Sequence, residues 1–581
     1  MINVYICVKQ VPDSKTIETD PLTGSLIRES AGSVPNPADN DAISLLSQMQ
    51  NNCPEIISAA ITMGPKQARA SLREALALGA MSAYHLDDPA LGGSDSYITA
   101  YALSQTIMHI GKADYVICGE KSSDSDTGQV PGAIAEFLGF SCYYGIIEFI
   151  EIDAKSKSMI AVRENEGIRQ TIQISSPAVL VPKSGAFPKL YSSMREKNAA
   201  RKKDIIKISV SDLADSNPDS YGYNASLTKI HAMVAAAPKR SAKIIDSEYT
   251  DFIRELLCSE NDESGNAIAL SKAKCTDSKD LADGVFAAVH LGDTHITSEL
   301  IGALQSEINA SKVTVLCNEH YANDVKLIAN EVIAFSSAGS SADDLLLEGV
   351  IDYIEEISPD AVLFPANVRG RWLSSKIAVR LKLGLTASCT GFIWEDNKLI
   401  QIRPAFEDRL MTAIYSTKKP ALATVREEMF PEAKKADTEG KIIKKQVLAK
   451  YSEKYKIISE EAVKPAEKQF SDKVLVIGNA VSSKTDFDKL VKWAEDNEMT
   501  WGVTRPLIQG GLAPFEKQIG VSGTAVKAKL AILLGVSGSR KTMAGLRLVN
   551  TLLAINEDPD AEVFSQVDYG IIGDYKQILK G

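Results

Sequence analysis

Residues 55–81, EIISAAITMGPKQARASLREALALGAM, join a short apolar run to an amphipathic helical pattern. The run has the length of a strand, and the residues after it repeat apolar positions at the spacing of one helix face. Strand-like runs also occur at 3–11 (NVYICVKQV) and 114–120 (DYVICGE), and a helical pattern fills 95–111. Strands separated by helices of this length predict a mainly parallel sheet with helices on both faces.

The same alternation begins again near residue 283, with the strand-like runs GVFAAVHLG, SKVTVLCNE and DAVLFPANV. The stretch before it, about 258–282, is polar, rich in small residues and weakly patterned, as linkers are. A third block starts at Lys473 with KVLVIGNAV, and the charged segment 436–456 in front of it is predicted to be a strand and a connecting arm. The sequence therefore predicts an α/β fold in four segments. They are an α/β domain at 1–257, a linker at 258–282, and two further α/β domains at 283–465 and 466–581.

Composition and charge exclude several classes of protein. The net charge of −11 argues against a general nucleic-acid binder, because phosphate binding needs a basic face. No run approaches the roughly 18 apolar residues of a membrane span. The chain opens on the strand-like MINVYICV and shows no signal peptide, so we expect a cytoplasmic protein without membrane insertion.

Neither the cysteines nor the histidines form a metal-binding pattern. The eight cysteines lie far apart without a C-x-x-C pair, and several sit in apolar strand-like runs. Buried reduced thiols are the expected state, which fits a reducing compartment. The six histidines do not repeat at metal-ligand spacing either. We therefore predict no metal site.

Loops that follow strands carry the nucleotide-binding potential, since ligands of parallel α/β sheets bind at the carboxyl ends of strands. After DYVICGE comes 121–139, KSSDSDTGQVPGAIAEFLG, in which Gly128 and the hydroxyls of Ser122, Ser123, Ser125 and Thr127 can surround a phosphate at a helix N-terminus. A polar turn with a helix cap explains the same residues about as well.

Two G-V-S-G loops lie close together near the C-terminus, at 520–526 (GVSGTAV) and 535–546 (GVSGSRKTMAGL). Gly–Ser–Gly after a strand lets backbone N–H groups approach an anion, although both loops can also be structural. Arg505 in WGVTRP can equally be a solvated surface charge, and no complete G-x-G-x-x-G follows a strand. The residues alone predict several α/β domains with loops suited to nucleotides.

Two sets of motifs, in order along the chain, carry a resemblance to a known family. The first set is CVKQVPD, NPADNDAI, MGPKQARASLREALALGA and DTGQVPGAIAEFLG, and the second is LFPANVRGR, GLTASCTG, RPAF, PALATVR, GVSGS, LAINEDPDAEVF and VDYGIIGD. Residues 1–257 resemble the β subunit of electron-transfer flavoproteins (ETF), and residues 283–581 resemble the α subunit. The chain thus resembles a natural fusion of the two subunits, with the β subunit first.

The resemblance implies three parallel-sheet α/β domains. Two nucleotide-binding-like domains form a pseudo-symmetric base, and a C-terminal Rossmann-like domain holds FAD. The family uses no side chain as a catalytic acid or base, so no catalytic residue is expected. The flavin carries the redox chemistry, while the protein sets its potential and its distance to partners.

The FAD site that the resemblance implies includes a possible flavin-ring charge at Arg505, a hydroxyl for flavin N5 at Ser522, and the adenosine-end residues Asn556 and Asp568. The full set is Thr504, Arg505, Ser522, Gly523, Ser537, Gly538, Ser539, Arg540, Thr542, Asn556 and Asp568. Thr542 replaces a histidine of the family, and Ala480 replaces an expected arginine. The backbone turns remain, so FAD binding is still expected.

In the N-terminal half the family binds AMP or a second FAD. The corresponding residues are Cys7, Asn36, Asp39, Met63, Asp124, Asp126, Thr127, Gly128, Gln129 and Val130. Glu120, Lys121 and Ser122 replace the usual Lys/Arg-Gln-Ala. The motif DTGQVPGAIAEFLG is closer to electron-bifurcating members, whose second FAD receives hydride from NADH, and both AMP and FAD stay open here.

The segment 187–203, FPKLYSSMREKNAARKK, is expected to contain the docking loop for a partner such as an acyl-CoA dehydrogenase-like flavoenzyme, with Met194 as the apolar anchor. Its basic run can also be a solvated arm. An alternative function is an ETF-like nucleotide-binding module that has lost FAD electron transfer. The replacements at Thr542 and Ala480 favour this alternative. A nucleotide-hydrolysing enzyme ranks last, because the chain has no P-loop.

Overall fold

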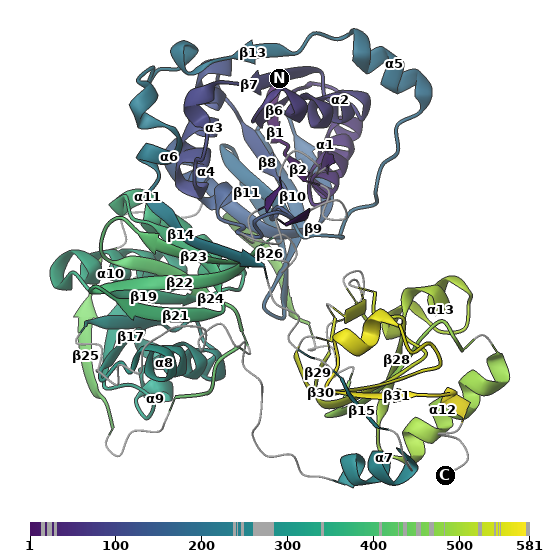
Figure 1. Cartoon of the computed structure of the whole chain (residues 1–581). Helices are drawn as coiled ribbons and strands as arrows, with labels where there is room; N and C mark the ends of the chain where they lie inside the picture. Colours follow the sequence, from purple (N-terminus) through teal and green to yellow (C-terminus); the bar gives the residue numbers. More distant parts are fainter. Residues whose placement is uncertain are drawn as a thin grey trace. The chain divides into compact units, whose positions relative to one another are not determined.

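The computed structural model divides into two compact units, which are described separately below (Figure 1). Unit 1 comprises Met1–Ala235 and Asp277–Val463, and unit 2 comprises Ala236–Thr276 and Lys464–Gly581. The structure describes residues 1–12, 18–19, 26–27, 32–235, 240, 242–245, 249–258, 284–337, 342–405, 410–427, 429–433, 439–448, 455–463, 470–481, 483–520, 524, 526–539, 542–543, 545–546 and 548–576.

The N-terminal half of unit 1 is built on a ten-stranded sheet. Its order is β13 (Ile206–Ile208), β7 (Ser82–Leu86), β6 (Ile56–Met63), β1 (Ile2–Cys7), β8 (Tyr115–Cys118), β12 (Ala178–Pro182), β9 (Ser141–Asp153), β10 (Ser158–Asn165), β11 (Ile168–Ser175) and β26 (Tyr455–Ala462). The pairs from β13 to β9 are parallel, and those from β9 to β26 are antiparallel.

Helices cover both faces of this sheet, as the sequence predicts. α1 (Asp39–Asn52) and α2 (Arg69–Ala77) pack in one hydrophobic cluster, and α3 (Ser96–Ile110) and α4 (Val130–Leu138) pack in another. The stretch 55–81 forms β6 and α2, joined by a short 3-10 turn. The apolar run becomes a central strand because both of its faces are buried.

A seven-stranded parallel sheet forms the second half of unit 1. Its order is β25 (Lys441–Gln446), β18 (Glu331–Ser336), β17 (Val313–Asn318), β16 (Phe286–Val289), β19 (Ala361–Pro365), β24 (Ala421–Val425) and β20 (Leu385–Cys389). This order matches β13-β7-β6-β1-β8-β12-β9 of the first sheet strand by strand. The Val8 amide bonds the Ile61 carbonyl at 2.9 Å, and the His290 amide bonds the Leu316 carbonyl at the same distance. The predicted pseudo-symmetric pair is confirmed.

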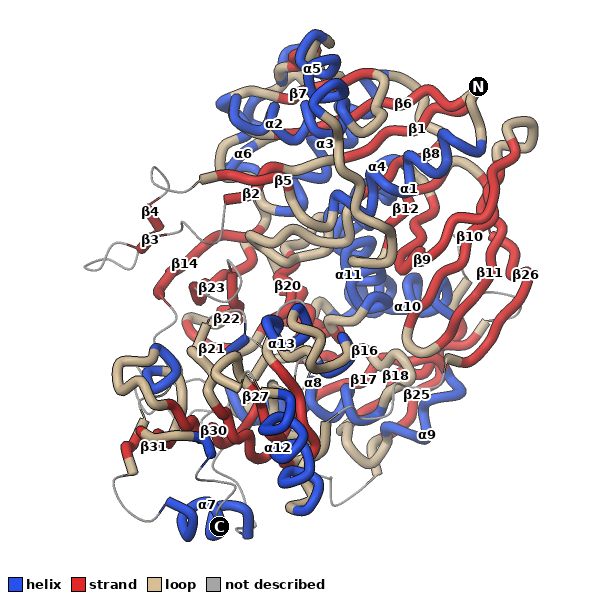
Figure 2. Tube along the Cα trace, turned by 90° about the vertical axis from the view of Figure 1, so that its right-hand side faces the viewer, coloured by secondary structure: helices blue, strands red, loops and turns tan. Residues whose placement is uncertain are grey.

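The two halves of unit 1 exchange strands. β14 (Thr228–Ala235), from the N-terminal half, pairs with β23 (Leu410–Ser416) in an antiparallel sheet that also holds β22 (Lys398–Ala405) and β21 (Gly391–Glu395). β26, which comes after the strands of the second half in the sequence, pairs with β11 of the N-terminal half. The two strands are antiparallel and lie side by side (Figure 2).

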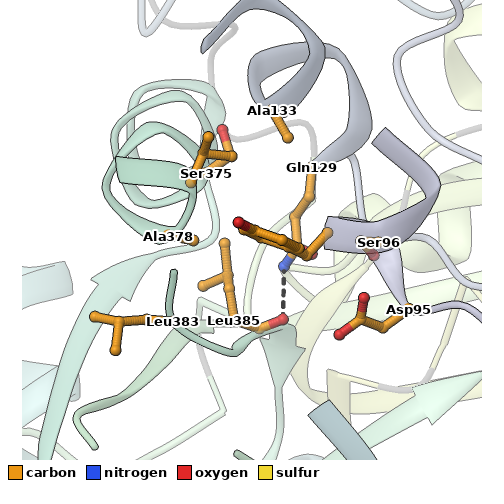
Figure 3. Close-up of a pocket in the computed structure, with 10 residues that line it drawn as sticks. Asp95, Ser96, Gln129, Ala133, Ser375, Ala378, Leu383 and Leu385 are labelled. Atoms are coloured by element: carbon orange, nitrogen blue, oxygen red, sulfur yellow. Dashed lines mark hydrogen bonds between the residues drawn. The ribbon is translucent and has the colours of Figure 1, made fainter. Parts of the chain in front are cut away.

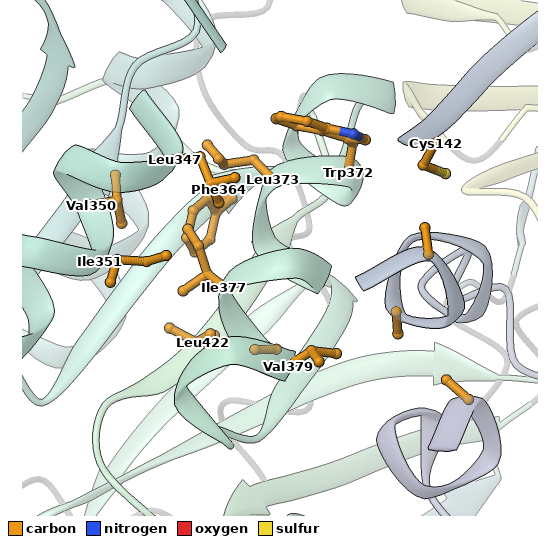
Figure 4. Close-up of a cluster of buried hydrophobic side chains, with 14 of the residues drawn as sticks. Cys142, Leu347, Val350, Ile351, Phe364, Trp372, Leu373, Ile377, Val379 and Leu422 are labelled. Carbon is orange, nitrogen blue, oxygen red and sulfur yellow. The ribbon is translucent and has the colours of Figure 1, made fainter. Parts of the chain in front are cut away.

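One hydrophobic cluster also joins the two halves. α11 (Val368–Leu381) contributes Trp372, Leu373 and Ile377, which belong to the same cluster as residues of α4 and Cys142 of β9 (Figure 4). α10 (Ala342–Ile357) packs on the other side of α11. Because residues of both halves belong to this cluster, the two halves share one core. Each fully buried Leu or Ile side chain in it stabilises the fold by about 1.5–3 kcal/mol.

Unit 2 contains a six-stranded parallel sheet. Its order is β15 (Lys243–Ile244), β31 (Tyr569–Ile572), β30 (Leu548–Asn556), β29 (Lys527–Leu534), β27 (Lys473–Ile477) and β28 (Thr500–Val503). α12 (Lys484–Asp496) contributes Phe487 and Leu490 to its core. This sheet agrees with the Rossmann-like C-terminal domain that the resemblance implies.

The first strand of that sheet comes from a distant part of the chain. β15 pairs with β31, and α7 (Tyr249–Cys258) places Phe252 against Tyr569, with ring centroids 5.1 Å apart. The predicted domain boundaries stay a prediction. These contacts nevertheless give unit 2 a strand and a helix from the segment that the sequence assigns to the N-terminal domain. Among the described residues, no helix is long and apolar enough to cross a membrane.

Candidate functional site

The carboxyl ends of the strands of unit 2 meet at one edge of its sheet. Ile477 of β27 pairs with Val503 of β28 and with Leu534 of β29, and Asn556 ends β30. Predicted FAD-site residues occupy this edge from three different strands. They are Thr504 and Arg505 after β28, Ser537, Gly538, Ser539 and Thr542 after β29, and Asn556 itself.

Contacts from neighbouring loops hold the turn after β29. Gly538 has φ of 86°, and a Cβ there would lie 2.2 Å from the backbone nitrogen of Val563. Gln566 donates its side-chain amide to the Gly538 carbonyl at 2.7 Å, and Asn556 donates to the Val536 carbonyl at 3.0 Å. A bare backbone turn at a strand end is the form that phosphate groups of nucleotides bind.

Thr504 provides a second sign of a ligand at this edge. Its side chain is buried, and its Oγ1 has no hydrogen-bond partner among the described residues. Arg505 follows as the exposed first residue of α13 (Arg505–Gln509). A buried hydroxyl without a partner is costly unless a ligand or water satisfies it, so the edge suits a polar ligand.

Asp568 lies away from these residues. It precedes β31, at the opposite end of that strand, and accepts hydrogen bonds from Arg240 Nη1 at 2.6 Å and from the Leu552 amide at 2.7 Å. Asp574, which the sequence reasoning missed, follows β31 at the ligand edge, where the Gly573 amide bonds the Asn556 carbonyl at 3.0 Å. The sequence signal that could have identified Asp574 is its place after β31, whereas Asp568 comes before that strand. Ser522, Gly523 and Arg540 lie outside the described residues.

A second edge in the N-terminal half of unit 1 collects the other predicted residues. Cys7 ends β1 and Met63 ends β6, while Asp124, Asp126, Thr127, Gly128 and Gln129 lie between β8 and Val130, the first residue of α4. Asn36 donates to Asp39 Oδ1 at 2.8 Å and to the Lys121 carbonyl at 3.0 Å, and accepts from the Ser123 amide at 3.1 Å. The start of α1 is therefore connected to the loop after β8.

Lys9, which the sequence reasoning did not single out, organises the charges of this edge. Its amide bonds Asp39 Oδ2 at 2.6 Å, and its ammonium pairs with Asp124 at 2.7 Å. Burial raises the pKa of Asp39 to about 7. Burial also acts to raise the pKa of Asp124, but the Lys9 ammonium and the hydrogen bonds from Ser122 and Ser125 together hold that pKa below its usual value.

Two arginines from the other half of unit 1 reach the loop after β8. Arg371 Nη2 pairs with Glu120 Oε1 at 3.2 Å, and a Cβ on Gly128 (φ 61°) would lie 3.0 Å from Arg371 Cδ. Arg403, 5% exposed, donates Nη2 to the Ser125 carbonyl. The Nε of each arginine has no hydrogen-bond partner among the described residues. Both lie in motifs quoted above, LFPANVRGR and RPAF, but only the fold brings them to this loop.

Gln129 contacts the other half of unit 1. Its Nε2 donates to the Leu385 carbonyl at 3.3 Å, and its side chain lines a small cavity with Ala133 of α4 and Ser375 and Ala378 of α11 (Figure 3). Its side chain therefore links the two halves, and its contact with a nucleotide stays a prediction.

The equivalent edge of the second sheet is closed by an ion-pair network. Only Ala366 and Asn367 separate β19 from α11, where the N-terminal half has the loop 119–129. Arg369 occupies the space, bonding the Leu291 carbonyl at 2.6 Å, Asp343 at 2.5 Å and Glu166 at 3.5 Å. Within the residues that the structure describes, these Arg369 contacts make the N-terminal edge the better candidate for a nucleotide. Within the described part of the chain, no group of three or more His, Cys, Asp or Glu residues is arranged to hold a metal.

Family comparisons match both units of the chain. The family described as "Electron transfer flavoprotein domain" matches residues 23–213 and 267–450 of this chain. These residues are more than half of the chain. The chain belongs to the electron transfer flavoprotein family. The description "Electron transfer flavoprotein FAD-binding domain" matches residues 469–547, so unit 2 carries the family's FAD-binding domain.

Relatives of both ETF subunits match this chain. The β subunit from Thermoanaerobacterium thermosaccharolyticum is 32% identical over 44% of this chain and 96% of its own length. The α subunit from the same organism is 33% identical over 40% of this chain and 72% of its own length. The chain is thus a fusion of the two ETF subunits. Subunit LctC of a lactate dehydrogenase (NAD(+),ferredoxin) from Acetobacterium woodii is 34% identical over 39% of this chain, which spans 56% of that relative's length.

Proposed function

We propose that this fused ETF carries electrons, through FAD in unit 2, between an electron donor and a dehydrogenase-type partner. The observation that supports it is the turn at Gly538, which lies within the FAD-binding domain match and whose carbonyls accept hydrogen bonds from Gln566 and Asn556. When bound, FAD supplies the redox chemistry, and the protein supplies orientation, charge and exclusion of other reactions.

The residues at the edge of unit 2 fit this cofactor. The backbone N–H groups of the turn 535–539 suit its diphosphate. Thr504 Oγ1 offers a buried hydroxyl, and Arg505 can place a positive charge near the ring. Asn556 and Asp574 lie at the same edge and suit the adenosine end. Asp568 is better explained as the ion-pair partner of Arg240.

The N-terminal edge suits an adenine nucleotide, either AMP or a second FAD. Asn36, Lys9 and the loop after β8 form one hydrogen-bonded frame. Arg371 and Arg403 bond that loop through their Nη2 atoms, and the Nε of each has no partner among the described residues. If this site holds FAD, the protein belongs with the NADH-dependent bifurcating members. If it holds AMP, the protein is a simple carrier supplied by a dehydrogenase.

The segment 187–203 is the proposed docking loop for the partner. Tyr191 is 82% exposed and Met194 is 67% exposed, and Arg195, Lys197 and Lys202 follow on α5 (Met194–Lys202). Exposed apolar side chains beside basic residues suit an acidic partner surface with an apolar pocket. The acyl-CoA dehydrogenase-like class stays our proposal. Subunit CarD of a caffeyl-CoA reductase–Etf complex, also from Acetobacterium woodii, is another relative, at 32% identity.

Anaerobic titration with NADH tests this function. A chain with two FADs whose absorbance bleaches with NADH is a bifurcating-type carrier. A chain with one FAD and one AMP that does not respond to NADH, but accepts electrons from a reduced acyl-CoA dehydrogenase, is a simple carrier. A chain that binds FAD but exchanges electrons with neither NADH nor a dehydrogenase contradicts the proposal.

A further inference from the structure

Cys7 and Cys118 are neighbours on adjacent strands. Each is the last residue of its strand, β1 and β8, and the register of this parallel pair sets Cys7 opposite Cys118. Adjacent strands lie about 4.8 Å apart, and paired residues send their side chains to the same face. That spacing lies within the Cα separation of about 4.4–6.8 Å that disulfides span. Interaction with the Cys7 side chain, together with burial, raises the pKa of the Cys118 thiol.

Access distinguishes Cys7 from the other thiols. Of the six cysteines whose burial the structure describes, Cys7 is half-buried, and Cys53, Cys118, Cys142, Cys317 and Cys389 are buried. Cys7 also stands at the N-terminal ligand edge, two residues before Lys9. A small oxidant arriving from solvent therefore meets Cys7 first, and Cys118 lies beside it on the neighbouring strand.

We propose that Cys7 and Cys118 form a reversible dithiol oxidation site. Hydrogen peroxide oxidises the Cys7 thiol to a sulfenic acid and is itself reduced to one water. The Cys118 sulfur then attacks the Cys7 sulfur, the S–S bond forms, and the hydroxyl leaves with the Cys118 proton as a second water. The two sulfurs together lose the two electrons that reduce the peroxide.

The bond affects the site that surrounds it. The bond would join the ends of β1 and β8 at the ligand edge, and an exposed disulfide is easier to reduce than a buried structural one. Gly119 follows Cys118, and a Cβ on it would lie only 2.4 Å from Asp39 Oδ1. Movement here is transmitted to Asp39 and the loop after β8. Oxidation is therefore expected to weaken nucleotide binding, a consequence that rests on the proposed N-terminal nucleotide site.

Peptide mapping tests the dithiol. The full chain, stripped of nucleotide, is treated with hydrogen peroxide, its free thiols are alkylated, and its peptides are analysed without reduction. We expect one new cross-link, between the peptides of Cys7 and Cys118, that dithiothreitol removes. Cys7→Ser and Cys118→Ser lack it, whereas Cys53→Ser retains it. Absence of this cross-link in the wild-type chain, or Cys7 oxidised without Cys118, overturns the proposal.

A second arm separates the dithiol from the nucleotide site. AMP or FAD, added before peroxide, is expected to slow cross-linking about tenfold or more at saturation, because ligand covers Cys7. The cross-linked chain is expected to bind AMP about tenfold more weakly until it is reduced. If the cross-link forms at the same rate with and without nucleotide, the dithiol proposal still holds. The same result contradicts the placement of the nucleotide site at Cys7.

Discussion

Gly538 is the residue on which the proposed FAD site depends most directly. Its φ of 86° is strained for any residue with a side chain, and an added Cβ would lie 2.2 Å from the Val563 nitrogen. We predict that Gly538→Ala weakens FAD binding about tenfold or more, since the turn must shift. Fluorescence titration with FAD measures the dissociation constant.

Gly510→Ala is the matched control in the same unit. An added Cβ there meets the Pro506 carbonyl oxygen at an ordinary 3.4 Å, and its φ is negative. Its dissociation constant for FAD should equal that of the wild-type chain. If the wild-type chain, Gly538→Ala and Gly510→Ala bind FAD with equal affinity, the turn at Gly538 is not part of the FAD site.

Asp39 should make the stability of unit 1 depend on pH. Burial raises its pKa to about 7 in the fold, whereas an unfolded Asp titrates near about 3.9. Folding thus takes up a proton between these values, so the contribution is full below about pH 4 and is lost as pH rises through about 7. Lys9, Asn36 and Asp124 face this carboxyl, and the first two act to lower its pKa without cancelling burial.

Calorimetry of the wild-type chain and Asp39→Asn measures this dependence. The variant stays neutral throughout, so the wild-type unfolding midpoint minus that of the variant should fall between about pH 4 and pH 7. A difference that stays constant across this range would show that Asp39 is already ionised in the fold.

Residues differ in how far the sequence predicts them. Gly128 is predicted from the sequence to help surround a phosphate in the loop after β8, and in the structure it has φ of 61°. Gln129 is the next residue, yet its side-chain amide donates a hydrogen bond to the carbonyl of Leu385, which lies 256 positions away in the sequence. Local pattern cannot reveal such a partner. The same reason applies to Arg371 and Arg403, whose motifs were recognised but whose contacts with Glu120 and Ser125 depend on how the two halves pack.

At the scale of elements, the loop after β8 depends on a helix from the other half. Arg371 of α11 pairs with Glu120 at one end of the loop and packs on Gly128 at the other. We predict that Arg371→Ala lowers nucleotide affinity at the N-terminal site about tenfold, while Arg371→Lys, which keeps the charge, recovers part of it. Isothermal titration with AMP on the nucleotide-free chain measures this.

Arg195→Ala removes an exposed arginine of α5 and serves as the control for charge alone. It should leave AMP affinity unchanged. If Arg371→Ala binds AMP as tightly as the control, the loop does not need α11. The unfolding midpoint, recorded for each variant, separates loss of the loop from loss of the fold.

The segment with β15 and α7 should stabilise unit 2. Arg240 and Asp568 form an ion pair at 2.6 Å, with side chains 14% and 22% exposed. Removing one partner of a largely buried pair leaves an uncompensated charge, so Arg240→Ala should lower the free energy of unfolding of unit 2 by about 1–3 kcal/mol. Lys484→Ala breaks an exposed pair with Asp488 in the same unit and should cost under about 0.5 kcal/mol. Equal effects in chemical denaturation would show that Arg240 does not anchor the segment.

Elements with strong local pattern are predicted well, and exchanged elements are not. Residues 55–81 form β6 and α2 because apolar spacing and burial agree there. β14 and β26 each pair with strands from the other half, and β15 pairs with β31 at the far end of the chain. Their partners are chosen by assembly of the whole unit, which the pattern of a short segment does not encode.

For the whole molecule, fusion fixes the two ETF subunits at one to one and raises their effective concentration. Strand exchange, the shared core and the ion pair of Arg380 with Glu136 at 2.6 Å make the two halves of unit 1 one structure. Unit 2 is assembled from Ala236–Thr276 and Lys464–Gly581, so it contains parts of both subunit-like regions.

The most direct test of the account is the FAD content per chain. The full-length protein is reconstituted with excess FAD, freed of unbound flavin by gel filtration, and extracted for quantification beside Gly538→Ala. We predict at least one FAD per wild-type chain and one fewer in the variant, while any nucleotide at the N-terminal site is retained by both. A wild-type chain that retains no FAD after reconstitution would contradict the claim that unit 2 is an electron-carrying flavin domain.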